Sequence, residues 1–257
     1  MLENKLDAII LLRGLGREQA HWMGIAEKIS ALYPDIRILP MDITGNGVFY
    51  QQASDTSVFK MREKLSERLN QEYPGVKSFA LIAISMGGMI ATEWAKAEPD
   101  KVKCLVLINS SFSGISPFYK RLKWQNYWKL IKATLGSVKV KEELIFSLTT
   151  NLINDVQTKK RVIDIWIEIA KYRPVSLINF IRQLIAAANY QLPLIKKPIL
   201  VLACKQDRLV DYTSSLKLIK RCEQAEIKIH PTAGHDLPLD DPDWLIEQIK
   251  AFIKTSG

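Results

Sequence analysis

The sequence predicts an α/β fold with a doubly wound, mostly parallel sheet and a helical insertion. Apolar runs of strand length alternate with amphipathic segments of helix length along most of the chain. These runs are apolar at nearly every position, as in strands that are covered on both faces. The alternation stops between residues 113 and 192, where apolar residues recur at helical spacing. We therefore expect a core of residues 1–112 and 193–257 and a helical cap of residues 113–192.

The first half of the core supplies four of the expected strands. They are Asp7–Leu12, Ile36–Leu39, Phe79–Ile84 and Cys104–Ile108, with Pro40 ending the second. Helices are expected at Gln19–Leu32, Val58–Leu69 and Gly87–Ala97. A turn-rich loop with glycines at positions 45 and 47 follows the second strand.

The second half of the core adds strands at Ile199–Ala203 and Ile227–His230 and helices at Ser214–Arg221 and Trp244–Lys254. Sheets of this kind bind their ligands at the carboxyl ends of the strands. Polar residues that directly follow a strand are therefore the first candidates for a functional site.

The whole-chain features are those of a globular protein of one domain, with or without an insertion. The chain has 257 residues, of which 47% are hydrophobic and 25% charged. Cys104, Cys204 and Cys222 form no C-x-x-C pair, which favours free, reduced thiols in a cytoplasmic protein. The acidic, short apolar N-terminus and the absence of a run of about 20 apolar residues predict no secretory signal and no stable membrane insertion.

Ser85 is the candidate nucleophile. The third strand runs directly into Ala83-Ile84-Ser85-Met86-Gly87, and a helix follows. A serine at such a sharp corner presents its hydroxyl above the sheet, and small residues two positions to either side leave room for the turn. Ala83 departs from the commoner G-x-S-x-G pattern. The alternative interpretation is an ordinary helix start without chemistry.

Asp207 and His235 are the candidate partners of this serine. Asp207 follows the fifth strand, where an aspartate is often only a turn residue, and Asp211 is the rival acid. His235 lies in a loop flanked by glycine and proline after the sixth strand, whereas His230 lies within that strand and is read as a packed histidine. Three such residues seldom follow three parallel strands in this order by chance.

At this point the sequence resembles the α/β-hydrolase superfamily, of the serine esterase type with a helical cap. The motifs are LLRGLG, ISMGGM, CKQDRLV and AGHDLPLDDP, and they span almost the whole chain. The resemblance implies a triad of Ser85, His235 and Asp207 and an oxyanion hole made by the backbone N–H groups of Leu15 and Met86. Arg13 stands where the family often has histidine. A structural role is favoured for Arg13, and contact with an anionic substrate is the alternative.

The charge is concentrated in the expected cap. Residues 113–192 hold 13 Lys and Arg against 5 Asp and Glu, so this stretch carries +8 of the chain's +9. A basic cap would attract an anionic substrate, such as one linked to acidic acyl carrier protein. Capped relatives that cleave pimeloyl-acyl-carrier-protein methyl ester offer a precedent through the resemblance. A solvated lid whose lysines serve solubility is the alternative.

The cap is also rich in aromatic residues, most of which must form its core. Trp124, Trp128 and Trp166 are candidate substrate contacts.

We expect a carboxylesterase that cleaves an ester or thioester with an apolar acyl or alkyl group through an acyl-enzyme on Ser85. A non-catalytic ligand-binding member of the fold is the alternative of another class. Neither a cofactor, nor a metal, nor nucleic acid is expected, because the three histidines form no H-x-x-x-H pair and no zinc or RNA-binding motif is present.

Overall fold

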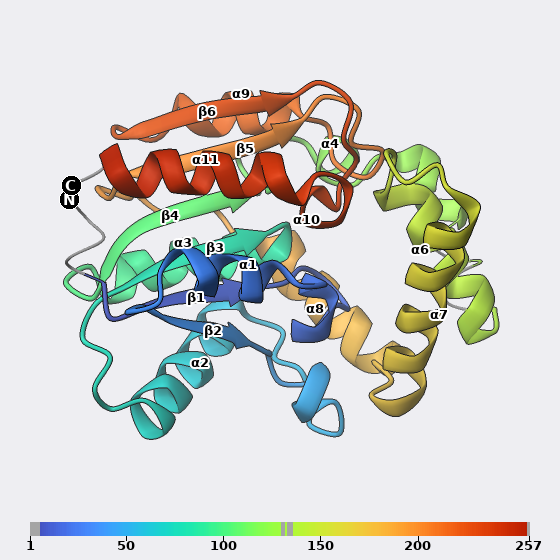
Figure 1. Ribbon diagram of the computed structural model, residues 1–257, viewed down its shortest axis with the longest axis horizontal. Coiled ribbons are helices and arrows are strands. Elements are labelled where there is room, and N and C mark those ends of the chain that lie inside the picture. The colour runs from blue at the N-terminus through green and yellow to red at the C-terminus, as the bar shows by residue number, and fades with distance from the viewer. Residues whose placement is uncertain (1–5, 130–131, 133–135, 256–257) are drawn as a thin grey trace.

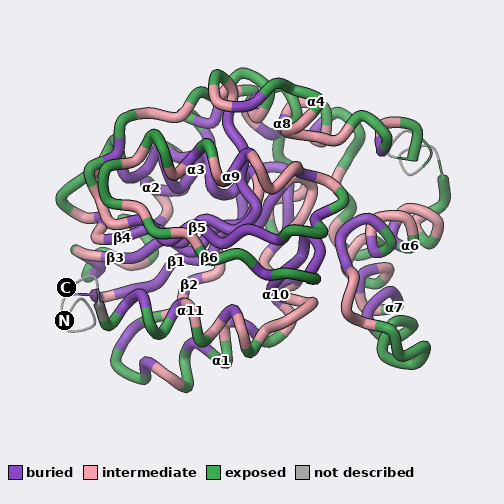
Figure 2. Tube along the Cα trace, turned by 90° about the horizontal axis from the view of Figure 1, so that it is seen from above, coloured by how far each residue is buried: buried purple, intermediate pink, exposed green. Residues whose placement is uncertain are grey.

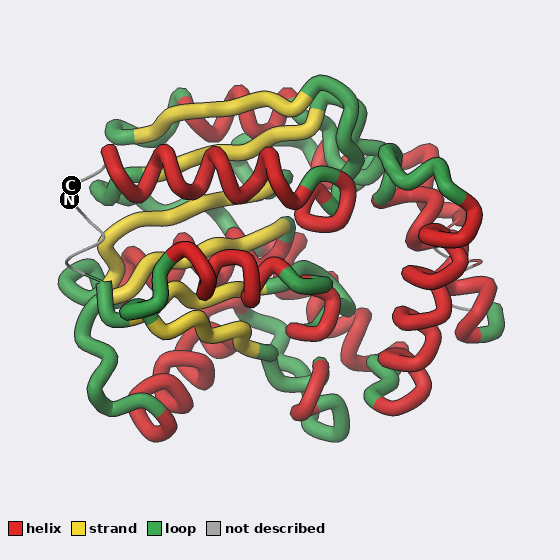
Figure 3. The backbone as a smooth tube through the Cα atoms, in the orientation of Figure 1, coloured by secondary structure: helices red, strands yellow, loops and turns green. Residues whose placement is uncertain are grey.

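The computed structural model describes residues 6–129, 132 and 136–255, and its centre is a six-stranded parallel sheet (Figures 1 and 3). The strands lie in the order β2-β1-β3-β4-β5-β6. They are β1 (Ala8–Leu12), β2 (Arg37–Met41), β3 (Phe79–Ile84), β4 (Val102–Ile108), β5 (Ile199–Cys204) and β6 (Ala225–His230). Every neighbouring pair is parallel, so all carboxyl ends lie at one edge. The predicted fold class is confirmed.

The second strand differs from its prediction. Pro40 does not end β2 but lies within it, paired with Leu11 of β1. Because β2 is the outermost strand, a residue without an N–H can occupy it without breaking a ladder on both sides. The expectation that Pro40 stops the strand was therefore wrong.

The first helical segment is also divided. A 3-10 helix, η2 (Gln19–Trp22), precedes α1 (Ile25–Leu32), in place of the single helix that was expected. Met23 and Gly24 separate them with φ values of 48° and 87°. This left-handed backbone cannot continue a right-handed helix, and glycine adopts it without strain.

Helices cover both faces of the sheet, as Figure 2 shows from above. The helices α2 (Val58–Glu72), α3 (Met86–Ala97) and α9 (Thr213–Ile219) pack on one face together with Ile10 of β1. The helices α1 and α11 (Pro242–Thr255) pack on the other face together with Ile9. Alternate residues of each strand thus enter two apolar layers, which hold the carboxyl edge of the sheet rigid.

The segment between β4 and β5 is helical throughout its described regular structure. It contains α4 (Phe118–Arg121), η4 (Trp124–Asn126), α6 (Val138–Thr149), α7 (Val156–Tyr172) and α8 (Leu177–Asn189). Figure 1 places α6 and α7 beyond the carboxyl ends of the strands. One isolated bridge, between Ser113 and Gln191, joins the two ends of the segment. Two short helices in the core, η3 (Gly47–Phe49) and α10 (Leu237–Asp240), complete the described elements, and no described helix is long and apolar enough to cross a membrane.

Candidate active site

Ser85 occupies a strained corner between β3 and α3. The strand ends at Ile84 and the helix begins at Met86, so Ser85 alone makes the turn, with φ of 57° and ψ of −122°. Residues other than glycine rarely adopt these backbone angles. Such backbone strain is found most often at functional sites. Three hydrogen bonds hold the corner: Ser85 N donates to Ile108 O (2.8 Å), and Ser85 O accepts from Gly88 N and from Ser110 Oγ (3.0 Å each).

The loop after β1 runs directly beside this corner. A Cβ atom placed on Gly14 would lie 2.9 Å from Cβ of Ser85. A Cβ atom on Gly87 would lie 2.6 Å from the carbonyl oxygen of Leu12, so a side chain cannot fit there. Ala83 is fully buried between β1 and β4, where its methyl group is accommodated. Glycine at positions 14 and 87 is therefore what allows the loop and the corner to meet.

Met86 and Leu15, the residues that the sequence predicts for an oxyanion hole, lie next in sequence to Ser85 and to Gly14. Met86 is the first residue of α3, and the first N–H groups of a helix have no partner within the helix. Leu15 follows Gly14 in the adjacent loop, and the next residue, Gly16, donates its N–H to Oε1 of Gln183 on α8 (2.9 Å). Sequence reasoning did not identify Gln183, which fixes the far side of this loop.

Asp207 and His235 are hydrogen-bonded. Nδ1 of His235 lies 2.7 Å from Oδ2 of Asp207, and both residues are buried. The other carboxylate oxygen, Oδ1, accepts from the backbone N–H groups of Leu209 (2.7 Å) and Val210 (3.0 Å). The carboxylate is therefore held in one orientation and directs one oxygen at the imidazole.

The rival acid, Asp211, has different partners. Its carboxylate accepts from the N–H and hydroxyl of Thr213 (2.9 and 2.6 Å), and Lys120 lies 3.6 Å away. These bonds, with the charge of Lys120, lower the pKa of Asp211 against the effect of its partial burial. The geometry therefore pairs the histidine with Asp207.

Asn109 ties the histidine loop to the sheet, and sequence reasoning missed it. Its Nδ2 donates to the carbonyl oxygens of His235 (2.9 Å) and Gly234 (3.3 Å), and its Oδ1 accepts from Cys204 N (2.9 Å). It directly follows β4 and has a φ of 47°. The available signal was its position, because it is a polar residue at a strand's carboxyl end.

Arg13 is directed at Asp236 in this structure. Its guanidinium donates two hydrogen bonds to the Asp236 carboxylate, at 3.0 and 2.7 Å, and lies 5.1 Å from the ring centre of Trp22. Both members of the pair are buried. This arrangement corresponds to the structural role that the sequence favoured over substrate contact.

The three candidate tryptophans lie in two different environments. Trp124 and Trp128 are 62% and 75% exposed, near α4. Trp166 is fully buried between α6 and α7, beside Phe146 and 4.1 Å from the Arg17 guanidinium. Its ring presents no surface to a ligand, because the helical segment needs it as core.

The remaining histidines and the cysteines are held by burial, packing and hydrogen bonds. Burial, with the nearby charges of Arg17 and Arg13, holds the pKa of His21 well below its usual value. His230 accepts from Ala233 N (2.9 Å) and packs edge-on against Trp244. The cysteines are free, and burial raises the pKa of Cys104 to about 12. Among the described residues, no group of three His, Cys, Asp or Glu side chains is placed to hold a metal.

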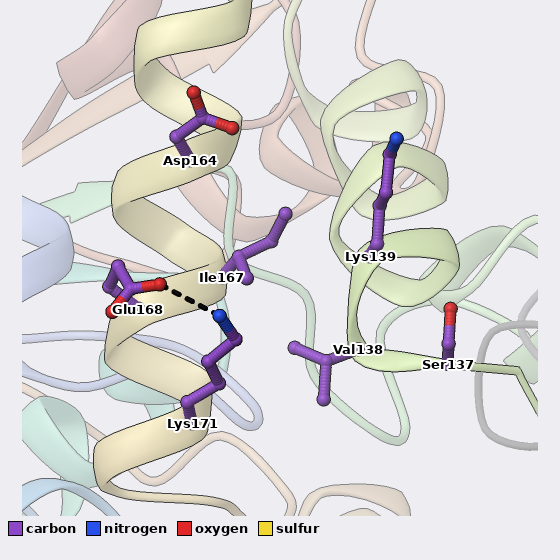
Figure 4. A pocket seen from close by; sticks show the side chains of 7 residues that line it. All are labelled: Ser137, Val138, Lys139, Asp164, Ile167, Glu168 and Lys171. Atoms are coloured by element: carbon purple, nitrogen blue, oxygen red, sulfur yellow. Dashed lines mark hydrogen bonds and ion pairs between the residues drawn. The ribbon is translucent and has the colours of Figure 1, made fainter.

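In the described part of the chain, one hollow lies on the helical segment and another lies where this segment meets the core. The first, shown in Figure 4, lies between α6 and α7 and is lined in part by the ion pair of Lys171 with Glu168 (2.9 Å). The second, of about 720 Å³, is lined by Trp124, Lys129 and Arg208 among others. It borders the Asp207 loop, because Lys123 in its lining donates to Asp207 O (2.6 Å). None of the three candidate catalytic side chains lines either hollow.

The chain is similar to hydrolases over most of its length. A family model described as "Serine aminopeptidase, S33" matches residues 13–242. The RutD protein of Agrobacterium fabrum, named as a carbamate hydrolase, is 25% identical over 250 residues, which are 95% of this chain and 92% of the relative. The pimeloyl-[acyl-carrier protein] methyl ester esterase of Aliivibrio salmonicida is 28% identical over 135 residues, 52% of this chain and 45% of the relative.

Solved structures share the fold at low sequence identity. The esterase EaEST of Exiguobacterium antarcticum superposes with a TM-score of 0.78 at 16% identity, over 97% of this chain and 92% of that one. The enol-lactonase of Burkholderia xenovorans gives a TM-score of 0.77 at 16% identity, with the same coverage. The family match includes the Ser85 corner and the loops of Asp207 and His235. The chain therefore belongs to the α/β-hydrolase superfamily, in the family described as serine aminopeptidase S33, and is a hydrolase.

Proposed function

We propose that this protein is a serine esterase that cleaves a carboxylic ester or thioester through an acyl-enzyme on Ser85. The observation that carries the proposal is the hydrogen bond between His235 Nδ1 and Asp207 Oδ2 (2.7 Å). A carboxylate on Nδ1 fixes that nitrogen as the donor and leaves Nε2 as the basic nitrogen. Ser85, on its strained corner at the same sheet edge, is the residue that this base would serve.

In the first half of the reaction, His235 Nε2 takes the proton of the Ser85 hydroxyl while Oγ bonds to the carbonyl carbon. The carbonyl oxygen becomes negative and accepts hydrogen bonds from the N–H groups of Leu15 and Met86. Each such donor typically contributes about 3 kcal/mol to transition-state stability. His235 then passes its proton to the departing alcohol or thiol, and the acyl group stays on Ser85.

In the second half, water replaces the alcohol. His235 takes a proton from the water, the resulting oxygen nucleophile attacks the acyl carbon, and the Ser85 oxygen leaves with the proton returned by His235. The products are a carboxylic acid and the free enzyme. Asp207 stays ionised and stabilises the imidazolium that forms in both halves.

Exposed tryptophans in the helical segment support the proposal that the substrate carries an apolar group. Residues 113–192 act in this proposal as a cap over a core of residues 1–112 and 193–257. Trp124 and Trp128 expose apolar surface there and remain candidate contacts for an acyl or alkyl group. The free cysteines fit the reducing cytoplasm, where we place the protein.

A second candidate is a methyl ester carried on acyl carrier protein. The +8 charge of residues 113–192 would favour docking of an acidic carrier, and pimeloyl-[acyl-carrier protein] methyl ester esterases match about half of the chain. A small-molecule methyl ester and its carrier-linked form, assayed at low and high salt, separate the candidates. Loss of activity in salt that is confined to the carrier-linked ester would favour docking.

The direct test uses p-nitrophenyl butyrate and a fluorophosphonate probe. We expect the wild type to hydrolyse the ester and to be labelled on Ser85. Ser85→Ala should lose both properties, while Ser30→Ala, at an exposed serine of α1, should keep them. Undiminished turnover by Ser85→Ala would refute the assignment. A folded wild type that binds esters without turnover or labelling would instead favour a ligand-binding protein.

A further inference from the structure

The helix α8 turns its polar side inward and its apolar side outward. Asn179 and Gln183 are 5% and 0% exposed. On the opposite side, Leu177, Ile178, Ile181, Leu184 and Ile185 are between 39% and 65% exposed. A surface helix normally buries its apolar stripe, so this reversal needs a cause.

The buried amides hold the helix in this orientation. Gln183 Nε2 donates to Asn46 Oδ1 (2.6 Å) and to Ser54 Oγ (2.9 Å). Asn179 Oδ1 accepts from Ser54 N (2.9 Å), and its Nδ2 donates to Gln52 O (2.9 Å). Rotating α8 to bury its isoleucines would break these bonds, so the apolar side stays outward in the folded chain.

Four exposed aromatic residues lie on or shortly after α4, which contacts the C-terminal end of α8. Arg121, at the end of α4, donates to the carbonyl oxygens of Ala187 and Ala188 and so joins α4 to the end of α8. The "α4–α8 face" comprises the five α8 residues above with Phe118, Tyr119, Trp124 and Trp128, and it holds nine of the fifteen large hydrophobic side chains that are exposed among the described residues.

The stretches of sequence that contain the residues of this face are basic. Residues 113–136 and 174–192 contain six Lys and Arg and no Asp or Glu. All five Asp and Glu residues of the helical segment lie between these stretches, at positions 142–168. Lys120 pairs with Asp211, and Lys123 donates to Asp207 O. Lys129, Lys132 and Arg182 are therefore the cations that we expect to attract an anionic partner and to repel a second copy of the face.

We propose that the α4–α8 face docks the protein on an anionic lipid membrane. Isoleucine and leucine would enter the outer acyl region, Trp and Tyr would lie at the headgroup level, and the lysines would contact lipid phosphates. An acidic protein would match the charge, but a broad apolar face with two tryptophans more than 60% exposed fits a lipid interface better. This inference does not depend on the proposed esterase activity, because binding alone tests it.

The test is co-sedimentation of the full chain with phosphatidylcholine vesicles that contain or lack phosphatidylglycerol. We expect binding to the anionic vesicles at low salt and at least about tenfold weaker binding to phosphatidylcholine alone or at high salt. The triple variant I178S/I181S/I185S should bind anionic vesicles about tenfold more weakly or worse. Its matched control, V48S/F59S/I229S, removes three exposed hydrophobic side chains outside the face and should bind as the wild type.

A second pair of variants tests the charge. K129Q/K132Q/R182Q should reduce binding to anionic vesicles, whereas K217Q/K228Q/K250Q, at exposed lysines of the core, should have little effect. Circular dichroism and thermal melting establish that each variant is folded. The proposal is overturned if the wild type ignores anionic vesicles or if face and control variants lose binding equally. It is also overturned if light scattering shows a wild-type dimer that I178S/I181S/I185S dissociates, since a second copy would then cover the face.

Discussion

Arg13 and Asp236 form a buried ion pair that joins the loop after β1 to the loop that carries His235. Nη1 and Nη2 of Arg13 donate to the carboxylate, at 3.0 and 2.7 Å, although the residues are 223 positions apart. Asp236 is the direct neighbour of His235, and Arg13 precedes Gly14 beside Ser85. The pair therefore couples the proposed oxyanion loop to the proposed base.

We expect Arg13→Met to destabilise the fold by about 3–5 kcal/mol, because it leaves the Asp236 carboxylate buried without its counter-ion. Urea unfolding measures this change. Lys28→Met is the matched control, since its ion pair with Asp243 is exposed and should contribute less than about 1 kcal/mol. The double variant R13M/D236L should recover most of the lost stability. Equal stabilities of Arg13→Met and the wild type would show that the pair contributes nothing.

Asn109 offers a test of how the histidine loop is positioned. Asn109→Asp keeps an acceptor for Cys204 N but loses the donor to His235 O and Gly234 O. We expect the kcat for p-nitrophenyl butyrate to fall by about tenfold or more with little change in KM, because a misplaced base weakens the chemical step more than binding. Asn70→Asp, at an exposed residue that accepts from Lys101, should leave kcat unchanged. A rise in KM at constant kcat would contradict a positioning role.

The strands and the strand-end candidates could be predicted because their signals are local. An apolar run followed by a polar residue identifies both a buried strand and a side chain at its carboxyl edge, as at Ile84 and Ser85. The Arg13 and Asn109 contacts could not be predicted this way, because they join segments far apart in sequence. Periodicity also overestimated the helix at Gln19–Leu32, where the left-handed Met23 and Gly24 interrupt it.

In the helical segment, too, local sequence patterns did not predict which residues are buried. Residue type marked Trp166 as a candidate contact, yet it is core, while Asn179 and Gln183 are buried in spite of their polarity. Partners in the loops of residues 44–54 and at Gly16 decide this orientation. A pattern within one helix cannot reveal hydrogen bonds that another segment supplies.

Substitution of two aspartates in turn tests which one is the acid of the proposed triad. Asp207→Asn keeps the size of the side chain but permits the wrong histidine tautomer, and it should reduce kcat by about 10⁴-fold. Asp211→Asn changes a carboxylate that bonds Thr213 instead, so its kcat should stay within about threefold of the wild type. The comparison uses p-nitrophenyl butyrate with both proteins shown to be folded. A larger loss in Asp211→Asn than in Asp207→Asn would reverse the assignment.

The buried Glu18 should make stability depend on pH. Burial, with the nearby charge of Asp42, raises its pKa to about 7, although Arg173 lies 2.7 Å away and acts in the opposite direction. Between the ordinary value of 4.5 and about 7, the folded state holds a proton that the unfolded state has released. This group's contribution to the free energy of unfolding therefore falls as pH rises through that window, and is restored as pH returns to about 4.5. Urea unfolding at several pH values measures this decline in the free energy of unfolding. Glu18→Gln cannot titrate at this position and should make the decline smaller. Glu247→Gln, at an exposed position of α11, should leave the decline unchanged. Parallel pH profiles for the wild type and Glu18→Gln would show that Glu18 titrates alike in the folded and unfolded chains.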